Sequence, residues 1–281
     1  PRVQDADLIL RSLGTDRVGK NPGFLMSGAR IKQLQGDSRT AGIYAVQAVK
    51  LLDASRPELM LAWFSDMRRI QADRMRLLQF LETTEDIGIT PEWMNYFRGR
   101  LYVEVKPAAR ADEQPEFNAA DLSKGEQILR ELSANATSEA VRNLCHRALG
   151  ESKYLRRDWA GAAEEFMKGV AAFPTDWELK NNVAYIYTRY LDRPQDALEL
   201  CEQASAVSEN NPDVLDTLGL TYTRLNRPQE AIEPLRRSRL LARNTIAYVA
   251  SSLHYAEALF ATGSPQNKAD AKTAFEEARQ A

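Results

Sequence analysis

Histidine and cysteine are scarce in this chain of 281 residues, which contains two of each. Catalytic triads need a histidine beside a nucleophile, and zinc sites use histidine and cysteine at characteristic spacings. His146 lies among apolar positions, and His254 shares its helix face with Glu257 but with no further candidate ligand. Cys145 and Cys201 lie far apart in apolar helical patterns, as expected for buried, reduced thiols. We therefore predict no enzyme: no catalytic residues, no metal site and no cofactor.

The sequence also lacks long apolar runs and an excess of positive charge. No run approaches the roughly 18 residues that a membrane-spanning helix needs. The formal net charge is −2, and basic clusters such as Arg68-Arg69 have acidic neighbours. A protein that coats phosphate backbones would be strongly basic. We expect no membrane span and no nucleic-acid partner, with an RNA-binding helical repeat as the minor alternative that a basic concave face would support.

An initiator methionine and a signal peptide are both absent, and the chain stops inside the helical pattern KTAFEEARQA. We therefore expect a piece of a longer protein. The composition, 44% hydrophobic and 27% charged, is that of a soluble chain that folds. The cytoplasm is favoured as its compartment, with the periplasm as the alternative.

What the sequence does contain is a repeat. LDRPQDALEL begins at Leu191, and LNRPQEAIEP begins 34 residues later at Leu225. In each copy the proline suits the first turn of a helix, and the acid after the glutamine favours its positive end. The alanine permits close contact with another helix, and we expect the arginine to lie in solvent. The motif therefore predicts a corner between two helices and not a chemical site.

A longer pattern runs along the predicted second helix of each pair: alanine, then a larger residue four positions on, then a small residue. Its copies are Ala41/Ala45/Ala48, Ala162/Phe166/Gly169, Ala197/Cys201/Ala204, Ala231/Leu235/Ser238 and Ala271/Phe275/Ala278. A doublet of a large and a small residue marks the predicted first helices, at Leu149-Gly150, Val183-Ala184, Leu218-Gly219 and Tyr255-Ala256. The repeated step of about 34 residues indicates antiparallel pairs of short helices.

This period, with small residues at helix contacts and a turn between paired helices, resembles the tetratricopeptide repeat (TPR) family. The resemblance implies an all-α fold, a right-handed superhelical solenoid of antiparallel helix pairs with about seven to eight repeats, some degenerate. It also implies a concave surface lined mainly by first helices. Function in such an array lies in surface residues that differ between copies.

The pattern divides the chain into three parts. Residues 1–55 hold N-terminal repeats, the first one truncated, and residues 138–281 hold four clear repeats. Residues 56–137 are degenerate, with an exposed loop expected near residues 106–118. The segment from Arg56 to Asp86 is either a helix pair or one longer helix. In the last part, Pro234 falls inside a predicted second helix, where we expect a modest bend.

Aromatic residues of the degenerate part are harder to place. Phe64 stands where the repeat pattern calls for a small residue. We expect the group to pack between repeats, with an apolar binding patch as the alternative. Its members are Trp63, Phe64, Trp93, Tyr96 and Phe97.

The stretch GTDRVGKN, from Gly14, resembles a phosphate-binding loop. It ends in Asn21 where serine or threonine would hold magnesium, and Pro22 follows at once. The preceding DADLILRSL has the pattern of a helix, whereas a phosphate loop follows a strand. We interpret the stretch as a turn between repeats.

On each predicted first helix, the face that points away from the core positions is the predicted partner-binding surface. The candidate residues on this concave face are Arg147, Glu151, Tyr154, Asn182, Tyr185, Arg189, Asp216, Leu220, Arg224, His254 and Glu257. Their mixture of donors, acceptors and rings suits an extended peptide or a partner helix. We predict a non-catalytic protein-interaction scaffold. The alternative is a regulatory, targeting or assembly segment of a larger enzyme or secretion complex.

Some TPR proteins bind a C-terminal carboxylate with a set of basic and asparagine side chains. Here only Arg147 and Asn182 resemble that set. Glu151 stands where a neutral amide is expected, and Asp213 and Thr217 stand where basic residues are expected. Acids at these places would repel a carboxylate. We therefore predict a different protein or peptide partner, and end repeats could also mediate self-association.

Overall fold

The protein is described by a computed structural model, which covers residues 4–5, 8, 12, 19–84, 86–106, 113–243, 245 and 247–280. Most of the predicted N-terminal helix DADLILRSL and most of GTDRVGKN lie outside the described residues. Asn21, which departs from the phosphate-loop pattern, caps the helix that follows by accepting a hydrogen bond from the Phe24 N–H. Its side chain therefore has a structural role as a helix cap.

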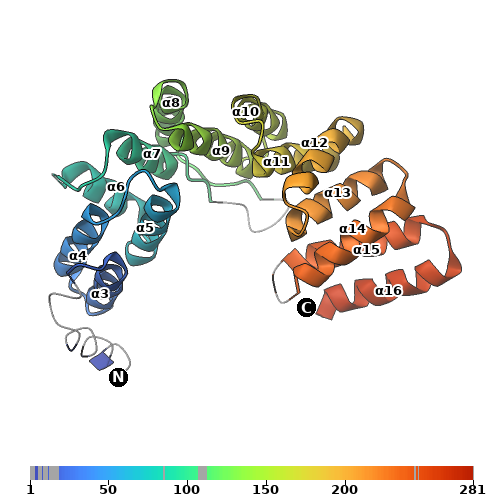
Figure 1. The fold of residues 1–281 in the computed structure, drawn as a ribbon, viewed down its shortest axis with the longest axis horizontal. Helices are drawn as coiled ribbons and strands as arrows, with labels where there is room; N and C mark the ends of the chain where they lie inside the picture. The colour runs from blue at the N-terminus through green and yellow to red at the C-terminus, as the bar shows by residue number, and fades with distance from the viewer. Residues whose placement is uncertain are drawn as a thin grey trace. The chain divides into compact units, whose positions relative to one another are not determined.

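Fourteen helices occupy the described residues, and their labels follow Figure 1. They are α3 (Pro22–Leu34), α4 (Ser38–Lys50), α5 (Pro57–Ile70), α6 (Arg74–Thr83), α7 (Pro91–Tyr102), α8 (Ala119–Asn135), α9 (Glu139–Leu155), α10 (Trp159–Ala172), α11 (Trp177–Arg189), α12 (Pro194–Val207), α13 (Pro212–Arg224), α14 (Pro228–Leu241), α15 (Ala247–Ala261) and α16 (Pro265–Gln280). They follow one another as pairs, from α3–α4 to α15–α16. No strand occurs in the described part of the chain, where a single β-bridge joins Lys106 to Glu116. The all-α solenoid of helix pairs is thereby confirmed.

The chain forms two compact units. The N-terminal unit contains residues 1–104 and 117–145, and the C-terminal unit contains residues 105–116 and 146–281. The boundary falls inside α9, between Cys145 and His146. Both free cysteines are buried, and burial raises the pKa of each thiol to about 12.

The degenerate part of the sequence folds as helix pairs. Its first segment is two helices, α5 and α6, which a break at residues 71–73 separates. Phe64 of α5 stacks on Phe97 of α7, with ring centroids 4.4 Å apart. Trp63 and Trp93 also contact Phe97, and all four rings are buried. These aromatics therefore form the core of the N-terminal unit and are not an exposed binding patch.

One acidic side chain of the N-terminal unit ties α7 to the turn before α9. The Glu92 carboxylate accepts hydrogen bonds from the Thr137 N–H at 2.6 Å, the Thr137 hydroxyl at 2.8 Å and the Ser138 N–H at 3.1 Å. The backbone N–H of Thr137 is the main cause that lowers the pKa of this carboxyl. Because the lowered pKa reflects bonds to the ionised form, the stabilisation is present above the unfolded-state pKa and is lost as the pH falls through the folded-state pKa.

We expect Glu92→Gln to lower the free energy of unfolding by about 1 to 2 kcal/mol at pH 7, since a charged cap becomes a neutral one. Urea unfolding followed by circular dichroism measures this loss. The deficit should shrink as the pH is lowered into the acid range. Glu131→Gln, at an exposed glutamate of α8, is the matched control and should cost less than about 0.5 kcal/mol. A deficit that is independent of pH would contradict the charged-cap interpretation.

The corners of the C-terminal unit repeat with the sequence period. Arg157, Asp192 and Asn226 each follow a first helix and each have a positive φ, at 65°, 51° and 59°. This left-handed residue reverses the chain before the next helix. The corners therefore place each second helix antiparallel to its first helix.

The duplicated RPQ motif forms the corners before α12 and α14, with the prolines in the first turn as predicted. Arg193 is exposed to solvent, as predicted, and Arg227 is partly exposed, but both arginines also make contacts that the sequence did not predict. Arg193 donates a hydrogen bond to Asp196 at 2.7 Å and lies over the Tyr187 ring at 4.3 Å. Arg227 likewise donates a hydrogen bond to Glu230 at 2.6 Å and lies over the Tyr222 ring at 4.8 Å. The motif thus joins the first turn of one helix to an aromatic ring of the preceding helix.

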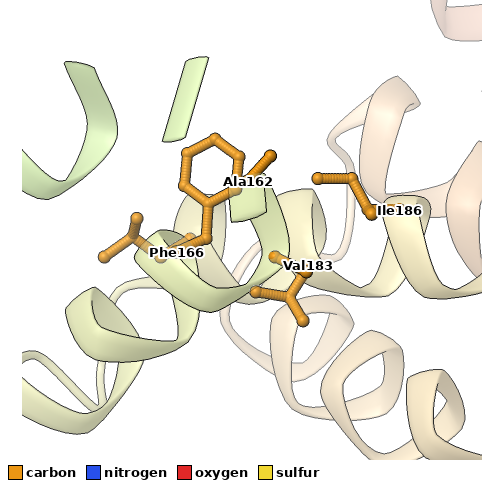
Figure 2. Close-up of a cluster of buried hydrophobic side chains, with 6 residues drawn as sticks. Ala162, Phe166, Val183 and Ile186 are labelled. Carbon is orange, nitrogen blue, oxygen red and sulfur yellow. The ribbon is translucent and has the colours of Figure 1, made fainter. Parts of the chain in front are cut away.

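The repeated alanine pattern marks close helix contacts. In Figure 2, Ala162 and Phe166 of α10 lie beside Val183 and Ile186 of α11, and all four are buried. A Cβ added at Gly150 would come 2.4 Å from the Phe166 ring, so only glycine fits there. Phe275, the corresponding large residue of α16, is 52% exposed. In α14, the helix continues through Pro234.

Candidate functional site

A groove of about 410 Å³ lies in the C-terminal unit and is lined mainly by the first helices α9, α11, α13 and α15. Its lining residues are Glu151, Tyr154, Phe166, Asn181, Asn182, Tyr185, Ile186, Asp213, Asp216, Thr217, Ala247, Ala250 and Ser251. First helices lie next to one another because α13 packs against both α11 and α15. The pairing of helices therefore builds one continuous surface from residues far apart in the sequence.

Aromatic side chains form one part of the groove. Tyr154 and Tyr185 line it, and both rings stand edge-on to Tyr190, with centroids 5.8 and 5.9 Å away. Tyr190 also stacks on Trp159, with ring centroids 3.9 Å apart. Burial is the main cause that raises the pKa of Tyr154, and it raises that of Tyr185 to about 12. Both phenols therefore remain neutral hydrogen-bonding groups at neutral pH.

Carboxylates form the other part of the groove. Glu151, Asp213 and Asp216 line it, and the lining set in the described residues includes no lysine, arginine or histidine. The pKa of Asp213 is raised by desolvation and by the nearby charge of Asp216. The groove therefore has a negative electrostatic character and disfavours further negative charge.

Two buried polar side chains on the groove are incompletely paired. Asp216 is 9% exposed, and its Oδ2 lies 2.8 Å from Nδ1 of His254. Its other oxygen, Oδ1, is buried without a hydrogen-bond partner in the described residues. Asn181 is also 9% exposed, and its Oδ1 has no partner in that part of the chain either. Buried acceptors of this kind are uncommon in folded proteins and need an explanation.

No family model and no curated protein matches this chain. Among solved structures, that of the APC/C hetero-tetramer Cut9–Hcn1 matches with a TM-score of 0.51 and 16% identity, over 92% of this chain and 46% of that chain. The chain has the tetratricopeptide-repeat fold. Two other matches are MamA AMB-1, at a TM-score of 0.44 and 15% identity over 69% of this chain and 97% of that one, and yeast Tom70, at 0.42 and 14% over 99% and 66%.

The groove of the C-terminal unit holds part of the predicted partner-binding set. The predicted residues that line the groove together are Glu151, Tyr154, Asn182, Tyr185 and Asp216. His254 contacts this group through Asp216. Arg189 is exposed beside the groove tyrosines, with its guanidinium 6.0 Å from the Tyr190 ring centroid. The period thus brings first-helix residues of successive TPR repeats into one surface.

Other predicted residues are engaged elsewhere in the TPR scaffold. Arg147 pairs with Asp176, the N-cap of α11, at 2.6 Å and with Glu178. Arg224 and Glu257 pair with each other. Leu220 is fully buried, which corrects its placement on the exposed face. The reason is that α13 packs against α11, α12, α14 and α15, so most of its surface is covered.

Several groove residues were not in the predicted set. They are Phe166, Asn181, Ile186, Asp213, Thr217, Ala247, Ala250 and Ser251. The signal for Asn181 is in the repeat itself, because it lies two residues before the Val183-Ala184 doublet, as Asp216 lies two before Leu218-Gly219. Strict use of the TPR register would have included it. The alanines and Ser251 carry no such signal because small residues also mark helix contacts.

The described residues contain no group of three or more His, Cys, Asp or Glu side chains placed to hold a metal ion. Among the helices of the same residues, none combines the length and apolar character needed to cross a membrane.

His146 is partly buried, and burial is the main cause that lowers its pKa. This side chain lies near the close contact of Gly169, where its Cβ would be 3.1 Å from an added Cβ.

Proposed function

We propose that this chain is a non-catalytic protein-interaction scaffold, which binds an extended peptide or a partner helix in the groove of its C-terminal unit. The supporting observation is that the groove is lined by four first helices of successive repeats. Side chains along it vary from repeat to repeat, whereas the helix contacts behind it keep the repeated pattern. Variation on a fixed scaffold is the arrangement that repeat proteins use for recognition.

The size of the groove suits a short segment of polypeptide. Packed helix axes lie about 8 to 10 Å apart, so four adjacent first helices span roughly 25 to 30 Å. An extended chain advances about 3.3 Å per residue, which makes this span about eight residues long. Polar side chains such as Asn182 can pair with backbone amides, and the tyrosine rings can pack on apolar side chains. The same binding would serve an assembly or targeting segment of a larger complex.

The proposed partner is not a carboxylate-terminated tail. Glu151, Asp213 and Asp216 all line the groove, and each would repel an acidic group. Arg147, which resembles a carboxylate-binding residue by its place in the sequence, pairs with Asp176 and Glu178. A ligand with acidic side chains would therefore have to displace existing ion pairs or desolvate like charges.

A photo-cross-linking experiment tests the location of the partner. The photoreactive residue p-benzoylphenylalanine would replace Ala250, an exposed residue that lines the groove. The matched control replaces Ala206, an exposed alanine of the second helix α12. We expect irradiation with an extract of native partners to give defined cross-linked proteins from Ala250 and not from Ala206. Equal products from both positions, or products from Ala206 alone, would contradict the groove as the binding site.

A further inference from the structure

The groove lining carries three carboxylates and, among the described residues, no lysine, arginine or histidine. Glu151 comes from α9, and Asp213 and Asp216 come from α13, so the carboxylates are contributed by two separate repeats. The other lining residues are neutral in the described part of the chain. Like charges gathered in a partly enclosed space raise the free energy of the unliganded protein, and a bound cation would lower it. Desolvation, and after it the nearby charge of Asp216, raise the pKa of Asp213.

Unpaired acceptors form the second and independent observation. Asn181 on α11 and Asp216 on α13 occupy equivalent positions of neighbouring repeats, and both line the groove. Each is nine-tenths buried, and each has one oxygen without a partner in the described residues. A buried acceptor that has lost its water is unfavourable until a donor reaches it. A ligand for this site should therefore carry hydrogen-bond donors.

The aromatic part of the groove adds a third feature. Tyr154 and Tyr185 line the same groove as the acids, and both phenols remain neutral at neutral pH. The face of a neutral tyrosine ring attracts a cation, and the ring also packs on an aliphatic chain. A side chain with an apolar stem and a cationic head would use both properties.

We infer that the groove binds a lysine or arginine side chain of the partner segment, with its cationic head at Asn181, Asp213 and Asp216 and its stem against the tyrosines. The ammonium and guanidinium groups are cationic, carry several donors and have no acceptor, which matches the charge and the unpaired oxygens. This inference rests on the proposed function, because it names the residue that anchors the bound peptide. A neutral donor such as the glutamine amide could hydrogen-bond to the unpaired oxygens, but it would not neutralise the negative charge of the carboxylates.

The test is selection from a phage-displayed library of random twelve-residue peptides against the whole chain. We expect the selected peptides to share a lysine or arginine at one position and to compete with cross-linking from p-benzoylphenylalanine at Ala250. The affinity of a selected peptide should fall about tenfold or more when norleucine replaces that basic residue. It should also weaken as salt increases.

The variant Glu151→Gln/Asp213→Asn removes two groove charges with little change in side-chain volume. We expect it to keep its thermal unfolding midpoint and to bind the selected basic peptide about tenfold more weakly. The control variant Glu199→Gln/Glu209→Gln removes two charges from exposed positions outside the groove lining and should bind as the original chain does.

The outcomes separate this inference from the proposed function. Peptides that compete at Ala250 but share no basic residue would overturn the basic anchor and leave the peptide-binding groove in place. A shared basic residue with equal losses in both double variants would also overturn the anchor, because the effect would come from net charge. Failure to select any peptide that competes at Ala250 would overturn the proposed function and the anchor together.

Discussion

Gly219→Leu is expected to lower the free energy of unfolding by about 2 kcal/mol or more. A Cβ added at Gly219 would come 2.3 Å from Cγ of Leu235, which is fully buried and belongs to the paired helix α14. Overpacking of a close contact costs roughly 1 to 3 kcal/mol, and leucine adds four carbon atoms here. Its better helix propensity returns about 1 kcal/mol at most. Steric overlap therefore outweighs the gain in helix propensity, and the free energy of unfolding falls. Urea unfolding measures this change.

Gly42 provides a comparison with a helical glycine that has more room around it. It lies inside α4, and a Cβ added there would be 3.4 Å from the nearest side-chain atom, on Phe80, which is ordinary contact. Gly42→Ala should stabilise the protein by up to about 1 kcal/mol, whereas Gly219→Ala should destabilise it. The double variant Gly219→Leu/Leu235→Ala exchanges the volumes across the contact and should recover part of the loss. Equal effects of both alanine substitutions would contradict the steric explanation.

These contacts explain why so much of the fold was predictable. An alanine or glycine that lets two helices approach must recur wherever the same pair recurs, so the period appears directly in the sequence. Ala197, Cys201 and Ala204 are all fully buried, as their pattern predicts. The prolines of the two RPQ motifs lie in first turns for an equally local reason.

The exposed face was less predictable because the period fixes which residues are equivalent but not how far each helix is covered. In α13, every residue from Val214 to Thr221 is buried, so the expected exposed stripe through Leu220 does not exist. Ion pairs between repeats add a second difficulty. Whether Arg147 faces a ligand or pairs with Asp176 depends on a three-dimensional neighbour 29 residues away. Sequence patterns of one helix do not contain that information.

The cation–π contacts of the corners show the same limit. Arg193 and Arg227 were expected in solvent because a charged residue before a helix is usually hydrated. Their tyrosine partners, Tyr187 and Tyr222, lie on the preceding first helices. The arginines and the tyrosines were both visible in the sequence, but their contact follows from the geometry of the corner.

Reversal of the groove charge is expected to reverse the choice of peptide. In Glu151→Lys/Asp213→Lys, two attractions for a basic side chain become repulsions. At partly exposed sites each reversal should cost roughly 1.5 kcal/mol, so together they should weaken a basic peptide about 100-fold. Both positions are at least partly exposed, so the lysine side chains can reach solvent without entering the core. Fluorescence polarisation with the selected peptide measures the loss.

The reversed chain also makes a positive prediction, which a misfolded variant could not meet. Selection from the same peptide library should now give peptides with aspartate or glutamate at the position that the original chain fills with a basic residue. Glu199→Lys/Glu209→Lys changes the net charge equally at exposed positions outside the groove lining and should keep the original preference. If both lysine variants shifted the preference alike, the long-range field of the chain would determine peptide choice. If only the groove variant shifts it, the local carboxylates determine specificity, because short-range contacts in a partly enclosed site are screened least by salt.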